Sequence, residues 1–311
     1  MPSIAQLEYI VAVDRERHFG IAAKQCFVTQ PTLSAQIKKA EELLGVSIFD
    51  RQQHPIIPTR LGQKIIAQAK ITLQEHHRLK QLVDDNQNNL VGTLSIGIIP
   101  TIAPYLLPLF VGDFVRTYPK IDLQIKEQTT AEIIEGLKTD QLDLGILVTP
   151  IKKDFLIGFP LYYENFQLYV HPNHPFAKND PIPLTQLRHQ EMWLLSQGHC
   201  FRNQVINLCP LQQTTPIHRK LPFSYQGHSF EALQRLVDLE GGYTLLPELV
   251  TLHHKKNVRS LQSPIPLREV SLVARQNYGK KKLLNVLQKV IQKAVPKHLL
   301  KADRGQIVEW R

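Results

Sequence analysis

Cys200 and Cys209 have the clearest capacity for chemistry in this sequence, because they lie nine positions apart beside cationic side chains. His199 precedes Cys200, and Arg202 follows it two positions later. The thiolate is the reactive form of cysteine, and nearby positive charge lowers the thiol pKa from about 8.5. A small buried thiol can also be inert core packing. The pair therefore indicates either redox chemistry or simple packing.

The remaining cysteine and the paired histidines favour no such chemistry. Cys26 lies in a short apolar segment, and we interpret it as a packing residue. Histidines stand side by side at 76–77 and 253–254, and adjacent residues do not share a helix face, which argues against a metal site. The sequence has no Cys-x-x-Cys motif and no glycine-rich phosphate loop. We predict no metal and no other cofactor.

The chain around these cysteines has an ordinary globular composition. Its 311 residues are 43% hydrophobic and 21% charged, which excludes wholesale disorder and is enough for two domains. No apolar run approaches the ~20 residues that cross a membrane. Three cysteines are too few for a disulfide scaffold. We therefore expect a cytoplasmic protein that makes no membrane contact.

The net charge of +10 is concentrated at the end of the chain. Residues 251–311 carry fourteen Lys and Arg against three Asp and Glu, whereas residues 1–60 carry seven against six. Basic charge is typical of nucleic-acid-binding proteins, but here it does not locate a DNA-binding surface. We interpret the lysines expected on a helix over 281–294 as a solvated face, with DNA or polymerase contact as the alternative.

Residues 1–60 have the pattern of a helix-turn-helix domain. Apolar residues recur three and four positions apart over 4–19, and a short second helix follows. Thr29 and Pro31 begin a third helix, and Gly45 ends it. The side of this helix away from its apolar residues carries small polar side chains, which are the kind that contact base edges in a major groove. The expected base contacts are Gln30, Pro31, Thr32, Ser34 and Gln36. The alternative is a solvated face of a core helix.

A wing and a long helix are expected next. Phe49–Arg51 and Ile56–Thr59 predict two short strands around a turn. The expected phosphate contacts are Lys38, Lys39, Arg51 and Arg60. Residues 61–90 predict a linker helix whose apolar residues have heptad-like spacing, which is typical of a dimerisation element.

From Gly92 onward, alternating strand and helix patterns predict an α/β domain with a mostly parallel sheet over residues 91–311. The expected strands are 93–99, 121–127, 142–148, 166–170, 192–195, 243–246 and 269–274. Their order predicts two lobes, with lobe I formed by 91–164 and 266–295 and lobe II by 165–265. Helices are expected near 203–209, over 230–238 and over 281–294.

The stretch from Phe19 to Arg51 (FGIAAKQCFVTQPTLSAQIKKAEELLGVSIFDR) resembles the DNA-binding domain of the LysR-type transcriptional regulators. The likeness extends over nearly the whole chain. It implies a winged helix-turn-helix and linker helix followed by a two-lobed α/β effector domain like a periplasmic binding protein. It also implies double-stranded DNA at a promoter operator, self-association as a dimer and commonly a homotetramer, and RNA polymerase as partners.

Three segments resemble the OxyR-type peroxide sensors of this family: residues 99–108 (IPTIAPYLLP), 198–202 (GHCFR) with Cys209 beyond, and 242–247 (GYTLLP). This likeness implies that hydrogen peroxide oxidises Cys200 to a sulfenic acid, which Cys209 resolves to a disulfide. The residues it assigns to the peroxide pocket and to support of the thiolate are Thr101, Thr130, His199 and Arg202. The sequence departs from the pattern at Asn203, where an acid is usual, in a longer 210–229 segment and in an extension over 296–311.

The apolar spacing of Phe201, Val205 and Leu208 predicts a helix between the two cysteines. Nine residues of helix span about 13.5 Å, whereas a disulfide needs Cα atoms about 4.4–6.8 Å apart. Disulfide formation must then refold this segment. We expect that refolding to change the dimer or tetramer arrangement on DNA and to activate an oxidative-stress response.

Two alternatives remain open. In the first, the chain is a LysR-type regulator controlled by a small metabolite between the effector lobes, and the cysteines are incidental. In the second, it is a thiol peroxidase with an accessory DNA-binding domain, although a complete helix-turn-helix and dimerisation helix argue against an enzyme.

Overall fold

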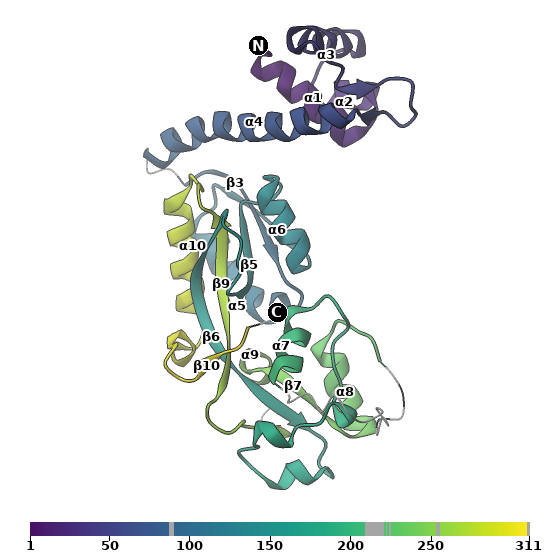
Figure 1. Cartoon of the computed structure of the whole chain (residues 1–311). Helices are drawn as coiled ribbons and strands as arrows, with labels where there is room; N and C mark the ends of the chain where they lie inside the picture. Colours follow the sequence, from purple (N-terminus) through teal and green to yellow (C-terminus); the bar gives the residue numbers. More distant parts are fainter. Residues whose placement is uncertain (87–89, 209–220, 222, 224, 253–255, 310–311) are drawn as a thin grey trace. The chain divides into compact units, whose positions relative to one another are not determined.

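The computed structural model describes residues 1–86, 90–208, 221, 223, 225–252 and 256–309. The chain divides into two compact units, Met1–Asn88 and Asn89–Arg311. Figure 1 shows the chain as a ribbon. The first unit has one apolar core, and the second unit has two.

The N-terminal unit is a three-helix core with a wing. Its helices are α1 (Ile4–Glu16), α2 (Phe19–Gln25) and α3 (Gln30–Leu44), and the wing pairs β1 (Phe49–Asp50) with β2 (Ile57–Pro58) antiparallel. A capping box at Ser3 begins α1, because the Ser3 hydroxyl accepts from the backbone N–H of Gln6 and the Gln6 side chain accepts from that of Ser3. The helix and wing predictions for this region are confirmed.

Helix α4 (Arg60–Asn86) follows the wing and packs on α1 through its first half. Ile66, Ala69 and Leu73 are buried there, and the Lys70 ammonium lies 2.8 Å from the Asp14 carboxylate. Leu79, farther along the helix, is 63% exposed in the single chain. An apolar side chain left in water at this spacing is what the predicted dimerisation element requires.

The second unit contains a sheet of order β4-β3-β5-β9-β6-β7, with β10 added to β9 and β8 added to β6. The strands are β3 (Gly92–Ile98), β4 (Ile121–Glu127), β5 (Leu144–Thr149), β6 (Leu156–Val170), β7 (Tyr243–Pro247), β8 (Val258–Arg259), β9 (Pro266–Arg275) and β10 (Gln306–Ile307). Strands β3, β4 and β5 are parallel, as predicted. The prediction of a mostly parallel sheet is wrong for most of the rest of it: β9 is antiparallel to both β5 and β6, and β7 and β8 are antiparallel to β6. The reason is that the chain leaves lobe I along β6 and returns along β9.

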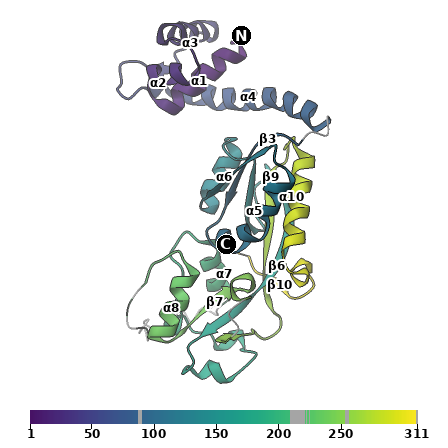
Figure 2. The same ribbon diagram turned by 180° about the vertical axis from the view of Figure 1, so that it is seen from behind.

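Six helices of the described chain pack on this sheet: α5 (Ala103–Thr117), α6 (Thr130–Lys138), α7 (Cys200–Leu208), α8 (Phe230–Glu240), α9 (Glu248–Thr251) and α10 (Lys281–Ala294). In lobe I, α5 and α10 lie side by side on one face of the sheet and α6 covers the other (Figures 1 and 2). Short 3-10 turns at Pro175–Lys178, Leu184–Gln186, His189–Glu191 and Lys297–Leu300 complete the unit.

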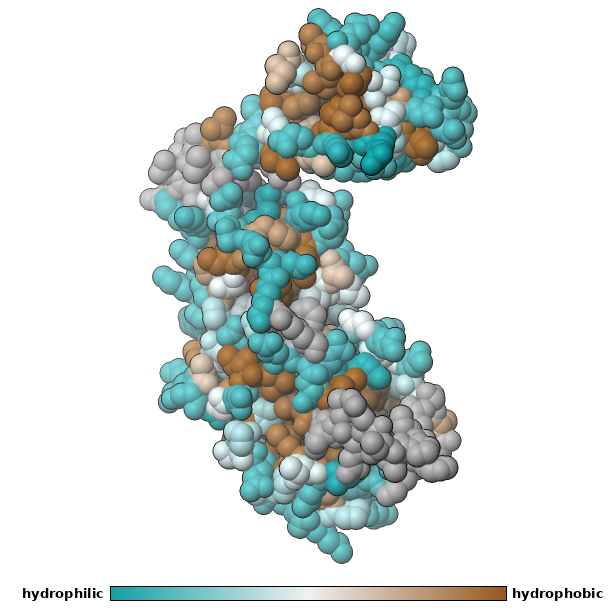
Figure 3. All heavy atoms as spheres, viewed as in Figure 1, coloured by the Kyte–Doolittle hydropathy of each residue, from teal (hydrophilic) through white to brown (hydrophobic). Residues whose placement is uncertain are grey.

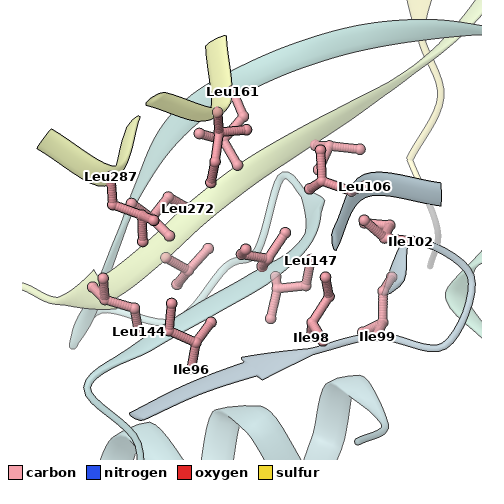
Figure 4. Close-up of a cluster of buried hydrophobic side chains, with 14 of the residues drawn as sticks. Ile96, Ile98, Ile99, Ile102, Leu106, Leu144, Leu147, Leu161, Leu272 and Leu287 are labelled. Carbon is pink, nitrogen blue, oxygen red and sulfur yellow. The ribbon is translucent and has the colours of Figure 1, made fainter. Parts of the chain in front are cut away.

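Each lobe has its own apolar core. In lobe I, side chains of β3, β5 and β9 meet those of α5 and α10, as Ile96, Leu147, Leu272, Leu106 and Leu287 do in Figure 4. A second cluster in lobe II gathers aromatic side chains, among them Phe166, Trp193, Phe230 and Tyr243. The core side chains are buried, whereas the face of the molecule drawn in Figure 3 is hydrophilic with apolar patches in between.

Two strand predictions were wrong. Residues 192–195 form only a single bridge, Met192 with Tyr243. The Trp193 carbonyl, which would accept a backbone hydrogen bond in a continued strand pairing, accepts from the Thr244 hydroxyl instead. Strand β6 begins ten residues before the predicted start at 166. Gly158, Pro160 and Glu164 interrupt its apolar pattern, so the sequence hides the part that crosses between the lobes.

Among the described residues, no helix combines the length and the apolar character that a membrane crossing requires. Within the same residues, no cluster of His, Cys, Asp and Glu side chains is arranged to hold a metal ion.

Candidate functional site

The starts of three helices converge near the Cys200 thiol. Cys200 is the first residue of α7, Thr130 is the first residue of α6, and Thr101 lies two residues before α5. Helix α7 begins where the chain passes between the two cores, since Cys200 packs with lobe I and Phe201 with lobe II. The Phe201 ring stacks on Phe166, with centroids 5.1 Å apart, which holds the helix start in place.

The Cys200 thiol is almost fully buried, with 4% of the residue exposed. Burial raises the pKa of this thiol above its ordinary value. Three features act against burial by lowering the pKa: the charge of Arg268, a hydrogen bond from the Thr130 hydroxyl, and the backbone N–H groups of Phe201 and Cys200. The sequence predicts a net lowering of the pKa, and that is wrong for this conformation because desolvation outweighs these contacts.

Arg268 on β9 is the cation whose charge lowers the pKa of the Cys200 thiol, and Arg268 is itself buried. Its Nε donates to the Glu164 carboxylate of β6 at 2.6 Å, and one Nη donates to the Thr101 carbonyl at 3.2 Å. The guanidinium carbon also lies 5.3 Å from the Phe201 ring centroid. This ion pair joins the two crossing strands and directs positive charge to the start of α7.

Among the side chains of Cys200, Thr101, Thr130 and Arg268, two buried polar atoms have no hydrogen-bond partner in the described part of the chain. They are the Thr101 hydroxyl oxygen and the Nη1 atom of Arg268. An unsatisfied buried polar group costs about 1–3 kcal/mol, and sites of this kind commonly hold a buried water molecule. The group of Cys200, Thr101, Thr130 and Arg268, termed here the thiol site, is therefore suited to a small molecule that both donates and accepts hydrogen bonds.

His199 and Arg202 lie beside Cys200 in the chain but contact other groups. His199 Nε2 lies 2.6 Å from Nδ1 of His228, and burial together with His228 lowers the pKa of His199. Arg202 donates from Nη1 to the Leu195 carbonyl at 2.8 Å. Neither residue is among the groups that shift the pKa of Cys200. Cys209 lies outside the described residues.

The outer side of α3 presents the residues predicted to contact DNA bases. Gln30, Pro31 and Thr32 are exposed in its first turn, while Leu33 and Ile37 are buried in the core. The Thr29 hydroxyl caps the helix and also lies 2.8 Å from the Thr32 hydroxyl. The first turn of α3 is therefore fixed by its core side and free on its outer side.

Other predicted DNA contacts are partly engaged within the unit. Gln36 accepts a hydrogen bond from the Gln6 side chain at 3.0 Å. Arg51 pairs with Glu41 at 2.9 Å and lies 3.4 Å from the Ser34 hydroxyl. The three remaining predicted phosphate contacts are exposed: Lys38, Lys39 and Arg60.

The Arg268–Glu164 pair and two residues near the wing were not predicted from the sequence. A charged residue inside an apolar strand, such as Arg268 among Leu267, Val270 and Leu272, is the signal that could have found the pair, because such a charge needs a buried partner. Near the wing, Arg17 and His18 line the same concave surface as Gln30, Ser34 and Arg51.

Comparison with known families assigns both units. The family model described as bacterial regulatory helix-turn-helix protein, lysR family, matches residues 4–63, and the LysR substrate binding domain matches residues 87–295. The chain therefore belongs to the LysR family, which confirms the resemblance and the fold class predicted from the sequence.

Individual relatives are similar over nearly the whole length. The chain is 35% identical over 277 residues to a hydrogen peroxide-inducible genes activator of Haemophilus influenzae, covering 88% of this chain and 90% of that protein. It is 33% identical over 278 residues to the DNA-binding transcriptional dual regulator OxyR of Escherichia coli, covering 88% and 89%.

Solved structures give the same result. A full-length OxyR variant from Pseudomonas aeruginosa matches with a TM-score of 0.77 at 30% identity, covering 97% of this chain and 100% of that chain. A hydrogen-peroxide-bound OxyR variant from Corynebacterium glutamicum matches with a TM-score of 0.62 at 26% identity, covering 100% and 98%.

Proposed function

We propose that this protein is a DNA-binding transcriptional regulator, and not an enzyme, that senses hydrogen peroxide by oxidation of Cys200. The observation that carries the proposal is the thiol site, where a buried sulfur lies beside a threonine hydroxyl and a cation, with two polar atoms unpartnered. Hydrogen peroxide is small, and it both donates and accepts hydrogen bonds. The names of the relatives support the same signal.

The chemistry at Cys200 proceeds in two steps. The thiolate attacks one oxygen of the peroxide, the O–O bond breaks, and hydroxide leaves and becomes water by taking up a proton, so that Cys200 becomes a sulfenic acid. The thiol of Cys209 then attacks the Cys200 sulfur and releases a second water as the disulfide forms. Overall, two thiols are oxidised and one peroxide is reduced to two waters.

The residues of the thiol site have distinct roles in the first step. Thr130 and Arg268 stabilise the thiolate that burial disfavours, because each favours the charged form of the sulfur. The free Thr101 hydroxyl and the free Arg268 Nη1 hold the peroxide. His199 and Arg202, which the sequence predicts as support for the thiolate, instead support the start of α7 through their bonds to His228 and Leu195.

The second step requires a change in α7. This helix has nine residues, and a helix of that length spans about 13.5 Å. A disulfide from its first residue to Cys209 therefore requires α7 to unwind or move. The refolding changes the dimer or tetramer arrangement, and with it the contacts that α3 makes with the promoter operator and that the regulator makes with RNA polymerase.

A free-thiol count by mass spectrometry, before and after one equivalent of hydrogen peroxide, tests the proposal. We expect a loss of two hydrogens that maps to a crosslink between Cys200 and Cys209. If Cys200 remains a thiol at micromolar peroxide, peroxide sensing is wrong, and a metabolite between the lobes becomes the signal to search for. If Cys200 stops at the sulfenic acid with Cys209 unchanged, the disulfide step is wrong.

A further inference from the structure

The C-terminal segment of the described chain lies against α7 and joins it to the central sheet. Strand β10 runs parallel to β9, with Gln306 opposite Pro266 and Ile307 opposite Leu267. Figures 1 and 2 show this segment passing beside α7. We call residues 306–309 the tail strand.

Val308 is the residue through which the tail strand connects the sheet to the helix. Its N–H donates to the Leu267 carbonyl at 2.8 Å, and its own carbonyl accepts from the Gln204 side chain at 2.8 Å. One helical turn farther on, the Asn207 side chain donates to the Glu309 carbonyl at 3.0 Å. Gln204 and Asn207 are three positions apart, so one face of α7 is attached to the tail strand.

The tail strand is itself anchored before it reaches α7. The Arg304 guanidinium lies 2.8 Å from the Glu248 carboxylate, and both side chains are mostly buried. The Gln306 N–H donates to the Ile265 carbonyl at 2.8 Å. Gly305 passes so close to that segment that a Cβ atom there would lie 2.1 Å from the Ile265 oxygen. A side chain at this position would therefore displace the tail strand.

We infer that the tail strand is a strap that stabilises the reduced, helical form of α7 and so sets how easily the disulfide closes. This inference rests on the proposed function. Refolding of α7 would break both of its side-chain bonds to the strap and remove Val308 from the lobe II cluster. Because linkage is reciprocal, oxidation must loosen the strap by the same factor by which the strap opposes oxidation.

Hydrogen exchange on the reduced full-length protein tests the strap without any oxidation. Gly305→Val displaces the strap, deletion of 306–311 removes it, and Lys301→Ala, an exposed residue before it, is the matched control. We expect the α7 amides to exchange about tenfold faster in the first two proteins, because two hydrogen bonds are lost. Unchanged exchange in both would overturn the inference, whatever peroxide does.

Oxidation then separates this inference from the proposed function. After peroxide treatment, the rate of sulfenic acid formation should be unchanged in the two strap variants. The equilibrium constant for closing the disulfide should rise about tenfold, and closure should be faster. A tenfold rise in that constant corresponds to a reduction potential about 30 mV more negative. If the wild-type protein forms no disulfide, the proposed switch is wrong. If it does form one and the variants match it in rate and potential, the strap is overturned.

Discussion

On the outer side of α3, hydroxyl and amide groups stand in water or bond to each other, whereas around Cys200 polar atoms are buried and two lack a partner. The first arrangement costs little and suits a large charged ligand that is bound by surface charge and shape. The second is costly and suits a molecule small enough to enter the interior. Under the proposed function, the surface of α3 binds DNA and the buried thiol site senses peroxide.

The largest expected effect separates these two tasks completely. Replacement Cys200→Ser removes the only atom of the thiol site that peroxide can oxidise, so the peroxide-induced change in DNA binding should disappear. Because α3 is untouched, affinity of the reduced protein for a promoter fragment should stay within about twofold. Fluorescence anisotropy with and without peroxide measures both, and Cys26→Ser should behave as the unchanged protein. A full response in Cys200→Ser would show that sensing lies elsewhere.

The next effect concerns the stability cost of the buried ion pair. Arg268→Met leaves the Glu164 carboxylate buried without its partner, and we expect the free energy of unfolding to fall by about 3–5 kcal/mol. Adding Glu164→Gln removes the stranded charge, so the double variant should regain much of this loss. Urea titrations followed by circular dichroism compare the proteins. A double variant no more stable than the single one would contradict this assignment.

The pH dependence of oxidation tests the electrostatics of Cys200. Because burial raises the pKa of this thiol, the rate should climb about tenfold per pH unit until pH passes the raised pKa. The same shift stabilises the folded protein below the unfolded pKa, and this contribution is lost as pH rises through the folded pKa. Thr130→Val removes a bond that favours the thiolate, so oxidation near pH 7 should slow roughly tenfold. Alkylation of quenched samples measures the rates, and equal rates for both proteins would exclude Thr130.

The smallest effect belongs to the DNA-binding face. Lys39 is exposed on α3, and Lys39→Ala should lower the salt dependence of binding by about one phosphate, a log–log slope change near 0.9. Arg51→Ala should change the slope less, because Glu41 already pairs with that guanidinium. Titrations at several salt concentrations compare them with Lys126→Ala, an exposed lysine of the other unit. A larger slope change for Arg51 than for Lys39 would reverse this ranking.

Local patterns predicted most of the elements correctly. Helix α10 was predicted with its observed bounds, and β4 likewise, because apolar periodicity and short-range signals decide both. The long strand β6 was predicted only at its end, since Pro160 and Glu164 disrupt the pattern. Their presence in a strand makes sense only once β9 lies alongside and Arg268 neutralises Glu164.

By itself, the sequence determined the helix-turn-helix, the alternation of strands and helices, and the cysteine in its Gly-His-Cys-x-Arg setting, because these depend on residues close together in the chain. Only the tertiary structure decided which cation lowers the pKa of Cys200. Arg202, two positions away, bonds to Leu195, while Arg268, far along the chain, is brought to the thiol by the pairing of β6 with β9. The charge and burial that tune a thiol come from whatever the fold packs against it, and neighbours in sequence on a helix point in different directions.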